Sequence, residues 1–146
     1  MELLKPIKKL TELSLGHKGF TDASLKQLKD FDDLTTLELC DSNVTDVGLK
    51  ELAALQKLTT LDLSFTFITG IGLKELHQLP DLTCLRLLRA TITDAGLEGL
   101  RDLDQLTTLC LSETQITDAG LKNLKGLKNL SNLNLHRTQI TRASGN

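Results

Sequence analysis

The sequence predicts an α/β fold, a right-handed solenoid with short parallel strands on a concave inner wall and short helices on the convex outer wall. Three observations predict it. The chain repeats itself every 24 residues, each copy opens with alternating apolar and polar residues, and each closes with leucines three residues apart. Alternation is typical of a half-buried strand, and the three-residue spacing of one helix face. One strand and one short helix bury too little apolar surface alone, so the copies must stack.

The copies follow one another without insertion. We expect one domain with a partial copy at 1–9, full copies at 10–33, 34–57, 58–81, 82–105 and 106–129, and a truncated copy at 130–146. Solenoids need polar caps at their ends, and neither end of this sequence carries one. Either the chain is a fragment of a longer array, which we favour, or a partner or a second copy covers its ends by end-to-end association.

The strand half of each copy supplies the expected core. Two leucines per copy alternate with polar residues, as Leu109 and Leu111 do with Thr108, Cys110 and Ser112. The equivalent inward pairs are Leu13/Leu15, Leu37/Leu39, Leu61/Leu63, Leu85/Leu87 and Leu133/Leu135, and Phe20 and Phe31 also occupy core positions. The alternation turns every leucine pair toward the same interior.

A Thr-Asp pair precedes most of the helical halves. In the copy at 106–129 the pair is Thr117-Asp118, where Thr117 is expected to cap the helix and Asp118 to place negative charge near its positive end. A glycine follows two or three residues later, at Gly48, Gly72, Gly96 and Gly120. Small residues there let neighbouring copies approach closely.

The pattern LxxLxLxxTxITDxGLxxLxxL resembles that of leucine-rich repeat proteins, and its ITDAGL signature resembles the cysteine-containing subclass and the 24-residue arrays of bacterial proteins. The resemblance implies protein–protein recognition through the concave face. The usual asparagine ladder is replaced by Lys18, Ser42, Thr66, Ala90, Thr114 and Thr138. Hydroxyls must therefore do most of that backbone bonding, and Ala90 cannot. The subclass cysteine is absent from the helical half, which weakens a comparison with F-box ubiquitin-ligase receptors.

Composition excludes several classes of function. A formal net charge of −2 favours neither nucleic acid nor an anionic membrane as a partner, and no apolar run reaches the roughly 20 residues that cross a bilayer. The sequence contains no metal-binding, nucleophile or phosphate-loop motif. We therefore expect a non-enzymatic protein without cofactor or metal. Three unpaired thiols and the lack of a signal peptide weakly indicate a cytoplasmic location.

The outward strand residues make the copies different from one another, and we call this surface the strand wall. Acidic residues concentrate in the first three copies, at Glu12, Glu38, Asp41 and Asp62, and basic ones in the last three, at Arg86, Arg89, His136 and Arg137. Phe65 and Leu88 lie between the two halves, with Phe67 nearby. An exposed aromatic residue beside arginines is typical of an interface hot spot.

The predicted partner-binding residues are therefore Glu38, Asp62, Phe65, Phe67, Arg86, Leu88, Arg89, Glu113, His136 and Arg137. The alternative is that the two phenylalanines pack on each other or on the turn, and that Asp62 and Arg86 form an ordinary surface ion pair contributing about 0 to 1 kcal/mol. Both interpretations fit the sequence.

The three cysteines are expected to be free thiols. Cys84 and Cys110 fall on adjacent strands two residues out of register, which separates their Cα atoms by about 8 Å, beyond the limit of roughly 7 Å for a disulfide. A less favoured alternative is that Cys110, beside Arg86 and diagonal to His136, is a reactive thiol.

Three functions are compatible with these observations. The favoured one is a scaffold that binds an unknown protein or peptide on its concave face. The second is a substrate-receptor or adaptor segment of a larger assembly such as an F-box ubiquitin ligase, and the third is a structural or self-assembling repeat unit.

Overall fold

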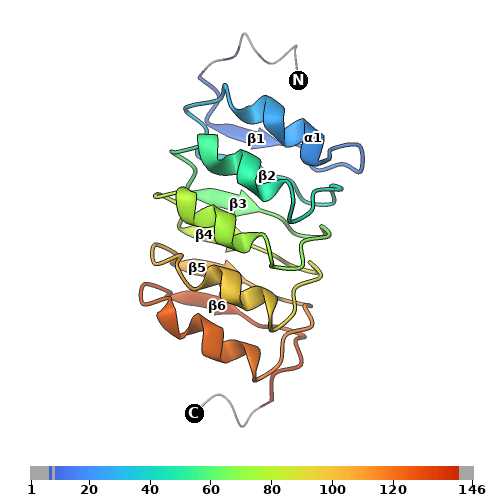
Figure 1. Cartoon of the computed structure of the whole chain (residues 1–146), viewed down its shortest axis with the longest axis vertical. Helices are drawn as coiled ribbons and strands as arrows, with labels where there is room; N and C mark the ends of the chain where they lie inside the picture. The colour runs from blue at the N-terminus through green and yellow to red at the C-terminus, as the bar shows by residue number, and fades with distance from the viewer. Residues whose placement is uncertain (1–6, 8, 142–146) are drawn as a thin grey trace.

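A computed structural model of the chain describes residues 7 and 9–141, and its six strands form one sheet. The strands are β1 (Glu12–Ser14), β2 (Thr36–Glu38), β3 (Thr60–Asp62), β4 (Cys84–Arg86), β5 (Thr108–Cys110) and β6 (Asn132–Asn134). Every pair is parallel, each strand pairs with the next in the chain, and each residue lies opposite the residue 24 positions later, as in Leu61↔Leu85. The predicted parallel solenoid is confirmed (Figure 1).

Short helices cover one face of the sheet in the five full copies from 10–33 to 106–129 (Figure 1). Only the first contains an α-helical segment, α1 (Asp22–Leu25), which continues as η2 (Lys26–Leu28). The others are 3₁₀ helices: η3 (Leu49–Ala54), η4 (Leu73–Gln78), η5 (Gly96–Leu100) and η6 (Gly120–Gly126). Tight 3₁₀ turns suit pieces of one or two turns, where few i→i+4 hydrogen bonds can form.

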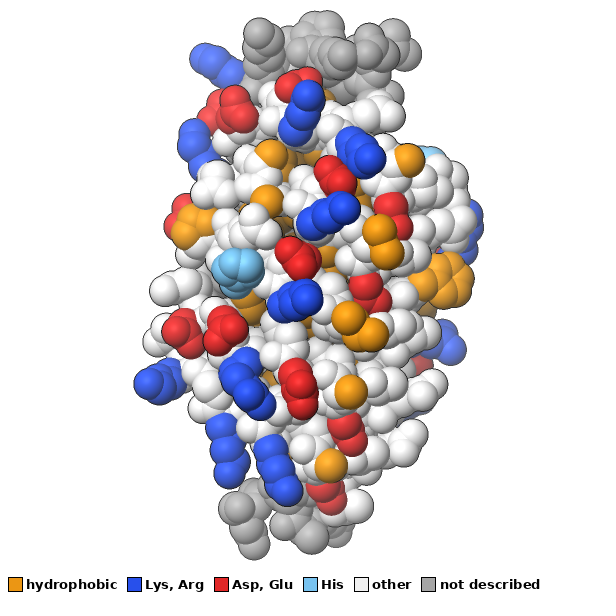
Figure 2. Space-filling view, viewed as in Figure 1, with side chains coloured by type: hydrophobic (Ala, Val, Ile, Leu, Met, Phe, Trp, Pro, Cys, Tyr) orange, Lys and Arg blue, Asp and Glu red, His pale blue; other side chains and the backbone are white. Residues whose placement is uncertain are grey.

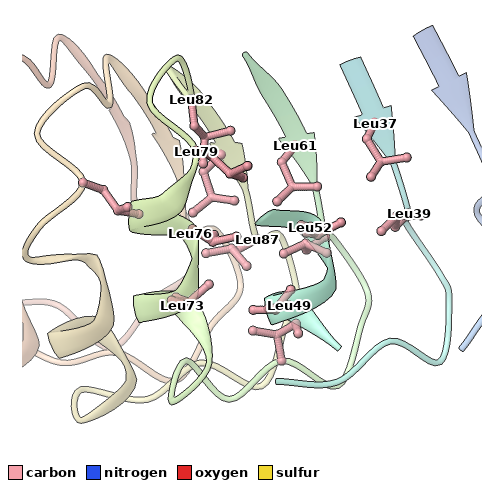
Figure 3. Close-up of a cluster of buried hydrophobic side chains, with 14 of the residues drawn as sticks. Leu37, Leu39, Leu49, Leu52, Leu61, Leu73, Leu76, Leu79, Leu82 and Leu87 are labelled. Carbon is pink, nitrogen blue, oxygen red and sulfur yellow. The ribbon is translucent and has the colours of Figure 1, made fainter. Parts of the chain in front are cut away.

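Leucines from both walls fill the space between strands and helices. Figure 3 shows Leu37, Leu61 and Leu87 of the strand side facing Leu49, Leu52, Leu73 and Leu76 of η3 and η4. Leu61, Leu85 and Leu109 are fully buried, and Phe20 and Phe31 are each 3% exposed, so the predicted core is confirmed. Leu133 on β6 is 39% exposed, because only one neighbouring strand flanks it in the described part of the chain.

The Thr-Asp pairs bond between copies, which corrects the predicted helix cap. The Thr117 hydroxyl does accept from the Ala119 backbone N–H at 3.2 Å, but Ala119, not Thr117, is the residue directly before η6. The same hydroxyl donates to Asp94 Oδ2 of the preceding copy at 2.6 Å. The Asp94 carboxylate also accepts the Thr117 backbone N–H at 2.7 Å. Asp118 likewise accepts from Thr141. Only the first copy has its threonine, Thr21, directly before a helix.

The same carboxylate-to-threonine bond recurs in four of the five junctions between the described copies that begin with 10–33. Asp22 binds Thr45, Asp46 binds Thr69, Asp94 binds Thr117 and Asp118 binds Thr141. The exception is the junction between copies 58–81 and 82–105, because Gly70 occupies the aspartate position. Gly70 has φ +106°, and its Cα lies so close to Gly96 that a Cβ at Gly96 would be 2.9 Å from it and 2.1 Å from the Thr69 carbonyl oxygen.

The position of the usual asparagine ladder behaves mostly as predicted. The hydroxyls of Thr66, Thr114 and Thr138 each donate to the carbonyl three residues earlier, at 2.6, 2.7 and 2.8 Å. Ser42 differs from the prediction. It is fully buried, yet its Oγ has no hydrogen-bond partner among the described residues. Serine lacks the methyl group whose packing restricts the threonine rotamer at χ1.

Candidate protein-binding surface

The parallel register brings the predicted charged residues of neighbouring strands side by side on the strand wall. Asp62 lies opposite Arg86, and Arg86 opposite Cys110. Arg86 and Asp62 approach to 3.9 Å, with Arg86 half exposed and Asp62 16% exposed. The predicted ion pair exists at the limit of contact, so it contributes little and leaves most of the arginine accessible.

A row of five residues borders the strand wall just after the strands, and we call it the rim row. It consists of Asp41, Phe65, Arg89, Glu113 and Arg137, and each has a left-handed backbone with φ between 55° and 59°. That conformation costs roughly 1–2 kcal/mol for a residue with a Cβ, and glycine or asparagine adopts it more readily. The repeat imposes the backbone, but it does not demand these bulky and charged side chains. Their presence therefore points to a role outside folding.

Side chains of the rim row contact one another along the solenoid. The Arg89 guanidinium stacks on the Phe65 ring, 5.6 Å from Cζ to the ring centroid, and its Nε lies 3.3 Å from Glu113 Oε2. The other Glu113 oxygen is 3.5 Å from an Arg137 nitrogen. One carboxylate thus serves two arginines, which leaves an excess of positive charge at this end of the row.

Phe67 takes part in a second cation–aromatic contact. The Lys18 ammonium lies 5.8 Å from the Phe67 ring centroid and 2.6 Å from Asp41 Oδ1. Phe67 is 54% exposed and Phe65 41%. Both rings therefore keep about half of their surface exposed, and each has a neighbouring cation. The sequence did not predict that Lys18 contacts Asp41 and Phe67. Its spacing of 23 residues from Asp41 is the signal that could have indicated the ion pair.

The remaining predicted residues are spread along the wall. Leu88 is half-buried beside the rim row, and Glu38 is partly exposed on β2. His136 is exposed after β6, two strands beyond Arg86, so it lies at the far end rather than with the phenylalanines. The structure therefore gathers Phe65, Arg89, Glu113 and Arg137 into one network and leaves Glu38 and His136 at the edges.

Comparison with known proteins identifies the family. Sequence profiles described as leucine-rich repeats match residues 32–91 and 106–125, which together cover more than half of the chain. The chain is a leucine-rich repeat protein. No curated protein matches its sequence.

Two solved leucine-rich repeat structures are similar in fold. An internalin (inlF) from Listeria monocytogenes is 28% identical with a TM-score of 0.66, over 80% of this chain and 32% of the internalin. The ectodomain of the Arabidopsis receptor kinase HAESA, in complex with an IDA peptide hormone ligand, is 23% identical with a TM-score of 0.65, over 94% of this chain and 23% of that one. The chain therefore spans a third or less of the length of these structures. The family supports a protein-interaction scaffold as the general class of function, and the two neighbours show the same fold.

The cysteines of this leucine-rich repeat chain lie on the strand wall as free thiols, as predicted. Burial raises the pKa of the Cys84 thiol, and Asp62 adds to this while Arg86 opposes it. Burial and the nearby Asp62, Glu38 and Asp41 carboxylates raise the pKa of Cys40. The Cys110 Sγ lies 3.5 Å from the Ser112 Oγ. Its proposed reactivity stays a prediction.

The helix face carries a second apolar feature that the sequence analysis missed. Val47 is 69% exposed and Ile71 72%, and the two border a shallow depression with Lys50, Lys74 and Glu75. Elsewhere on this face, acidic and basic side chains alternate (Figure 2). The signal was available, because Val47 and Ile71 occupy the position of Ala23, Ala95 and Ala119 in the other copies.

Two further findings limit the chemistry of the described residues. No three His, Cys, Asp or Glu side chains converge there as a metal ion would require. Within the same part of the chain, every helix is too short or too polar to cross a lipid bilayer.

Proposed function

We propose that this leucine-rich repeat chain is a non-enzymatic binding module that holds a protein or peptide partner on its strand wall, with Phe65, Leu88, Arg86 and Arg89 as anchors. One observation carries the proposal: the Phe65 side chain is exposed at a left-handed backbone position, its backbone bonds to that of half-buried Leu88, and the accessible Arg89 guanidinium lies over its ring. Aromatic and arginine side chains in such clusters supply much of the energy of protein interfaces.

The contacts that these side chains already make do not prevent binding. The Arg89–Glu113 and Arg86–Asp62 pairs are 3.3 and 3.9 Å long with mostly accessible arginines. Exposed pairs of this kind contribute about 0 to 1 kcal/mol. A partner can therefore replace them at small cost, and the wall needs little rearrangement because the sheet fixes its side chains in rows.

The test compares three forms of the chain as bait for binding partners. The double variant Phe65→Ala/Arg89→Ala is expected to lose the proteins that the wild type retains, with affinity reduced by at least about tenfold. The matched control is Val47→Ala/Ile71→Ala, which removes two exposed apolar side chains from the helix face. Equal retention by the wild type and the Phe65/Arg89 variant contradicts the proposal, and loss with the control alone would assign binding to the helix face.

Two finer alternatives are kept as proposals. The first is a substrate-receptor or adaptor segment of a larger assembly, such as an F-box ubiquitin ligase. Leu133 is 39% exposed on the outer strand, which supports end-to-end self-association. Sedimentation over a range of concentrations separates the two, because only self-association gives a mass that rises with concentration. The unpaired thiols support a cytoplasmic location in either case.

A further inference from the structure

We infer that the partner is an extended peptide segment with segregated charges: basic side chains over β1–β3, an apolar side chain at Phe65 and Leu88, and acidic side chains over β4–β6. The inference rests on the proposed function, because it takes the strand wall as the binding surface. It goes further by stating the chemistry of the partner and which strands each part of it covers.

The two halves of the wall differ in the sign of their charge. Along β1–β3 and the rim beside them lie four carboxylates, Glu12, Glu38, Asp41 and Asp62, against the single ammonium of Lys18. Along β4–β6 the balance is reversed, since Arg86, Arg89 and Arg137 face only Glu113. A partner with one sign of charge throughout would be repelled by one half of the wall.

Several of these charges remain available to a partner. Glu12 and Glu38 form no ion pair with any described residue, and they border a shallow depression together with Ser14 and Thr36. A lysine or arginine side chain entering this depression would meet both carboxylates. At the other end Glu113 is shared by Arg89 and Arg137, whose side chains are 59% and 70% exposed. A partner carboxylate can therefore bind these guanidinium groups without displacing Glu113 completely.

Two apolar side chains lie beside the boundary at which Asp62 and Arg86 meet. Phe65 belongs to the copy of β3 and Leu88 to that of β4, and the Phe65 amide donates to the Leu88 carbonyl at 2.7 Å, so the two residues are direct neighbours. The change in the sign of charge falls between the same two strands. An apolar side chain of the partner fits at this boundary because neither charge sign is favoured there.

Strand spacing sets the length of the segment. Six strands at about 4.8 Å span roughly 24 Å, which an extended peptide covers with about seven residues at 3.3 Å each. The basic and acidic groups of the partner must then lie on opposite sides of a central apolar residue. Interleaved charges of the same composition would place like charges against each other at both ends.

The experiment selects binders from a phage-displayed library of random 12-residue peptides. The baits are the wild type, the wall variant Arg86→Glu/Arg89→Glu and the control Lys50→Glu/Lys74→Glu, which makes the same charge change on exposed lysines of η3 and η4. We expect the wild type and the control to enrich peptides with basic and acidic residues on opposite sides of an apolar residue. The wall variant, acidic along β4 as well, should instead enrich basic peptides.

One enriched peptide is then synthesised with a fluorescent label and titrated by anisotropy. Its affinity should fall at least tenfold for the wall variant and less than twofold for the control. A synthetic isomer with interleaved charges should also bind the wild type at least tenfold more weakly. Equal affinity of the two isomers would overturn the inference.

Failure of the inference differs from failure of the proposed function. One outcome is that the enriched peptides have no segregation of charges and yet bind the Phe65→Ala/Arg89→Ala variant more weakly than the wild type. That result overturns the inference about the partner and leaves the proposed binding surface in place. Peptides unaffected by Phe65→Ala/Arg89→Ala, or no enrichment by the wild type, overturn both. Far-UV circular dichroism of each variant checks that these surface substitutions leave the fold intact.

Discussion

At the scale of single residues, one position in each copy decides whether a buried turn is fully hydrogen-bonded. Threonine satisfies it at Thr66, Thr114 and Thr138, whereas the Ser42 hydroxyl is buried without a partner. A buried polar group that lacks a hydrogen bond costs about 1–3 kcal/mol. Ser42 is therefore a weak point in an otherwise regular interior.

The substitution Ser42→Thr should stabilise the chain. Thr66 and Thr114 show that a threonine fits this buried position with its hydroxyl bonded to the carbonyl three residues earlier. The added methyl group should therefore direct the residue 42 hydroxyl to the carbonyl of Leu39. We expect the free energy of unfolding in urea to rise by about 1 kcal/mol. Ser42→Ala is the matched comparison, since it removes the unpaired hydroxyl without forming the bond. A lower stability for Ser42→Thr than for Ser42→Ala would contradict this explanation.

The thiol of Cys84 should react slowly at neutral pH. Its pKa is raised, first by burial, so less of the reactive thiolate exists in the folded chain than in the unfolded one. Iodoacetamide labelling at pH 7.5, followed by mass spectrometry of the Cys84 peptide, should be several-fold slower for folded protein than for protein in urea. The difference should shrink as the pH rises above the pKa of the folded-state thiol. Equal rates at pH 7.5 would show that burial does not protect this group.

At the scale of elements, carboxylate bonds hold the segments before η3, η4 and η6 against the preceding copy. Asp46 is the most connected, because it accepts from the backbone N–H groups of Thr69, Gly70 and Gly72 and from the Thr69 hydroxyl. Asp94 accepts two hydrogen bonds, both from Thr117. Hydrogen bonds to a charged acceptor contribute about 1.5–3 kcal/mol each.

Removal of these carboxylates should cost stability in proportion to the bonds lost. We expect Asp94→Ala to lower the free energy of unfolding by about 2 kcal/mol and Asp46→Ala by more, since it leaves more partly buried donors unpaired. Asp102→Ala is the control, because Asp102 is an exposed aspartate in a loop and should change stability by less than about 0.5 kcal/mol. Equal effects of all three would mean that the carboxylates matter only for net charge.

Sequence reasoning predicted some elements fully and others not at all. The register and the buried leucines followed from the period of 24, since a parallel stack allows only one alignment of Leu61, Leu85 and Leu109. The role of Thr117 was predicted within its own copy, because a cap is a local motif, whereas its main partner, Asp94, is 23 residues away. The contacts of Lys18 and Arg89 with the phenylalanine rings depend on side-chain rotamers, which residue spacing does not determine.

At the scale of the whole molecule, each copy contacts only its neighbours, so stability should vary along the solenoid. The leucines of β3 and β4 and those of the flanking strands β2 and β5 are fully buried. All three residues of β6, in contrast, are exposed. Regions with few buried contacts open locally at low free energy.

Hydrogen exchange followed by mass spectrometry should reveal this gradient. In the 146-residue chain, peptides that cover β6 should exchange first and those that cover β3 and β4 last, because opening the centre exposes the most leucine surface. Uniform protection along the chain would instead indicate a single cooperative unit.

The glycine that replaces aspartate at position 70 has a consequence for engineering. Deleting residues 58–81 as one block would join the copy that ends at Lys57 directly to the copy that begins at Leu82. Asp46 would then meet Thr93 across the new junction with the spacing of 23 residues found in the other bonded pairs, and the junction without a carboxylate-to-threonine bond would be removed. A protein shortened in this way would lose Phe65 and Phe67 and would have a carboxylate-to-threonine bond at each junction from Asp22 to Thr141. The deletion would therefore remove the proposed binding residue Phe65 without removing any aspartate that joins the copies.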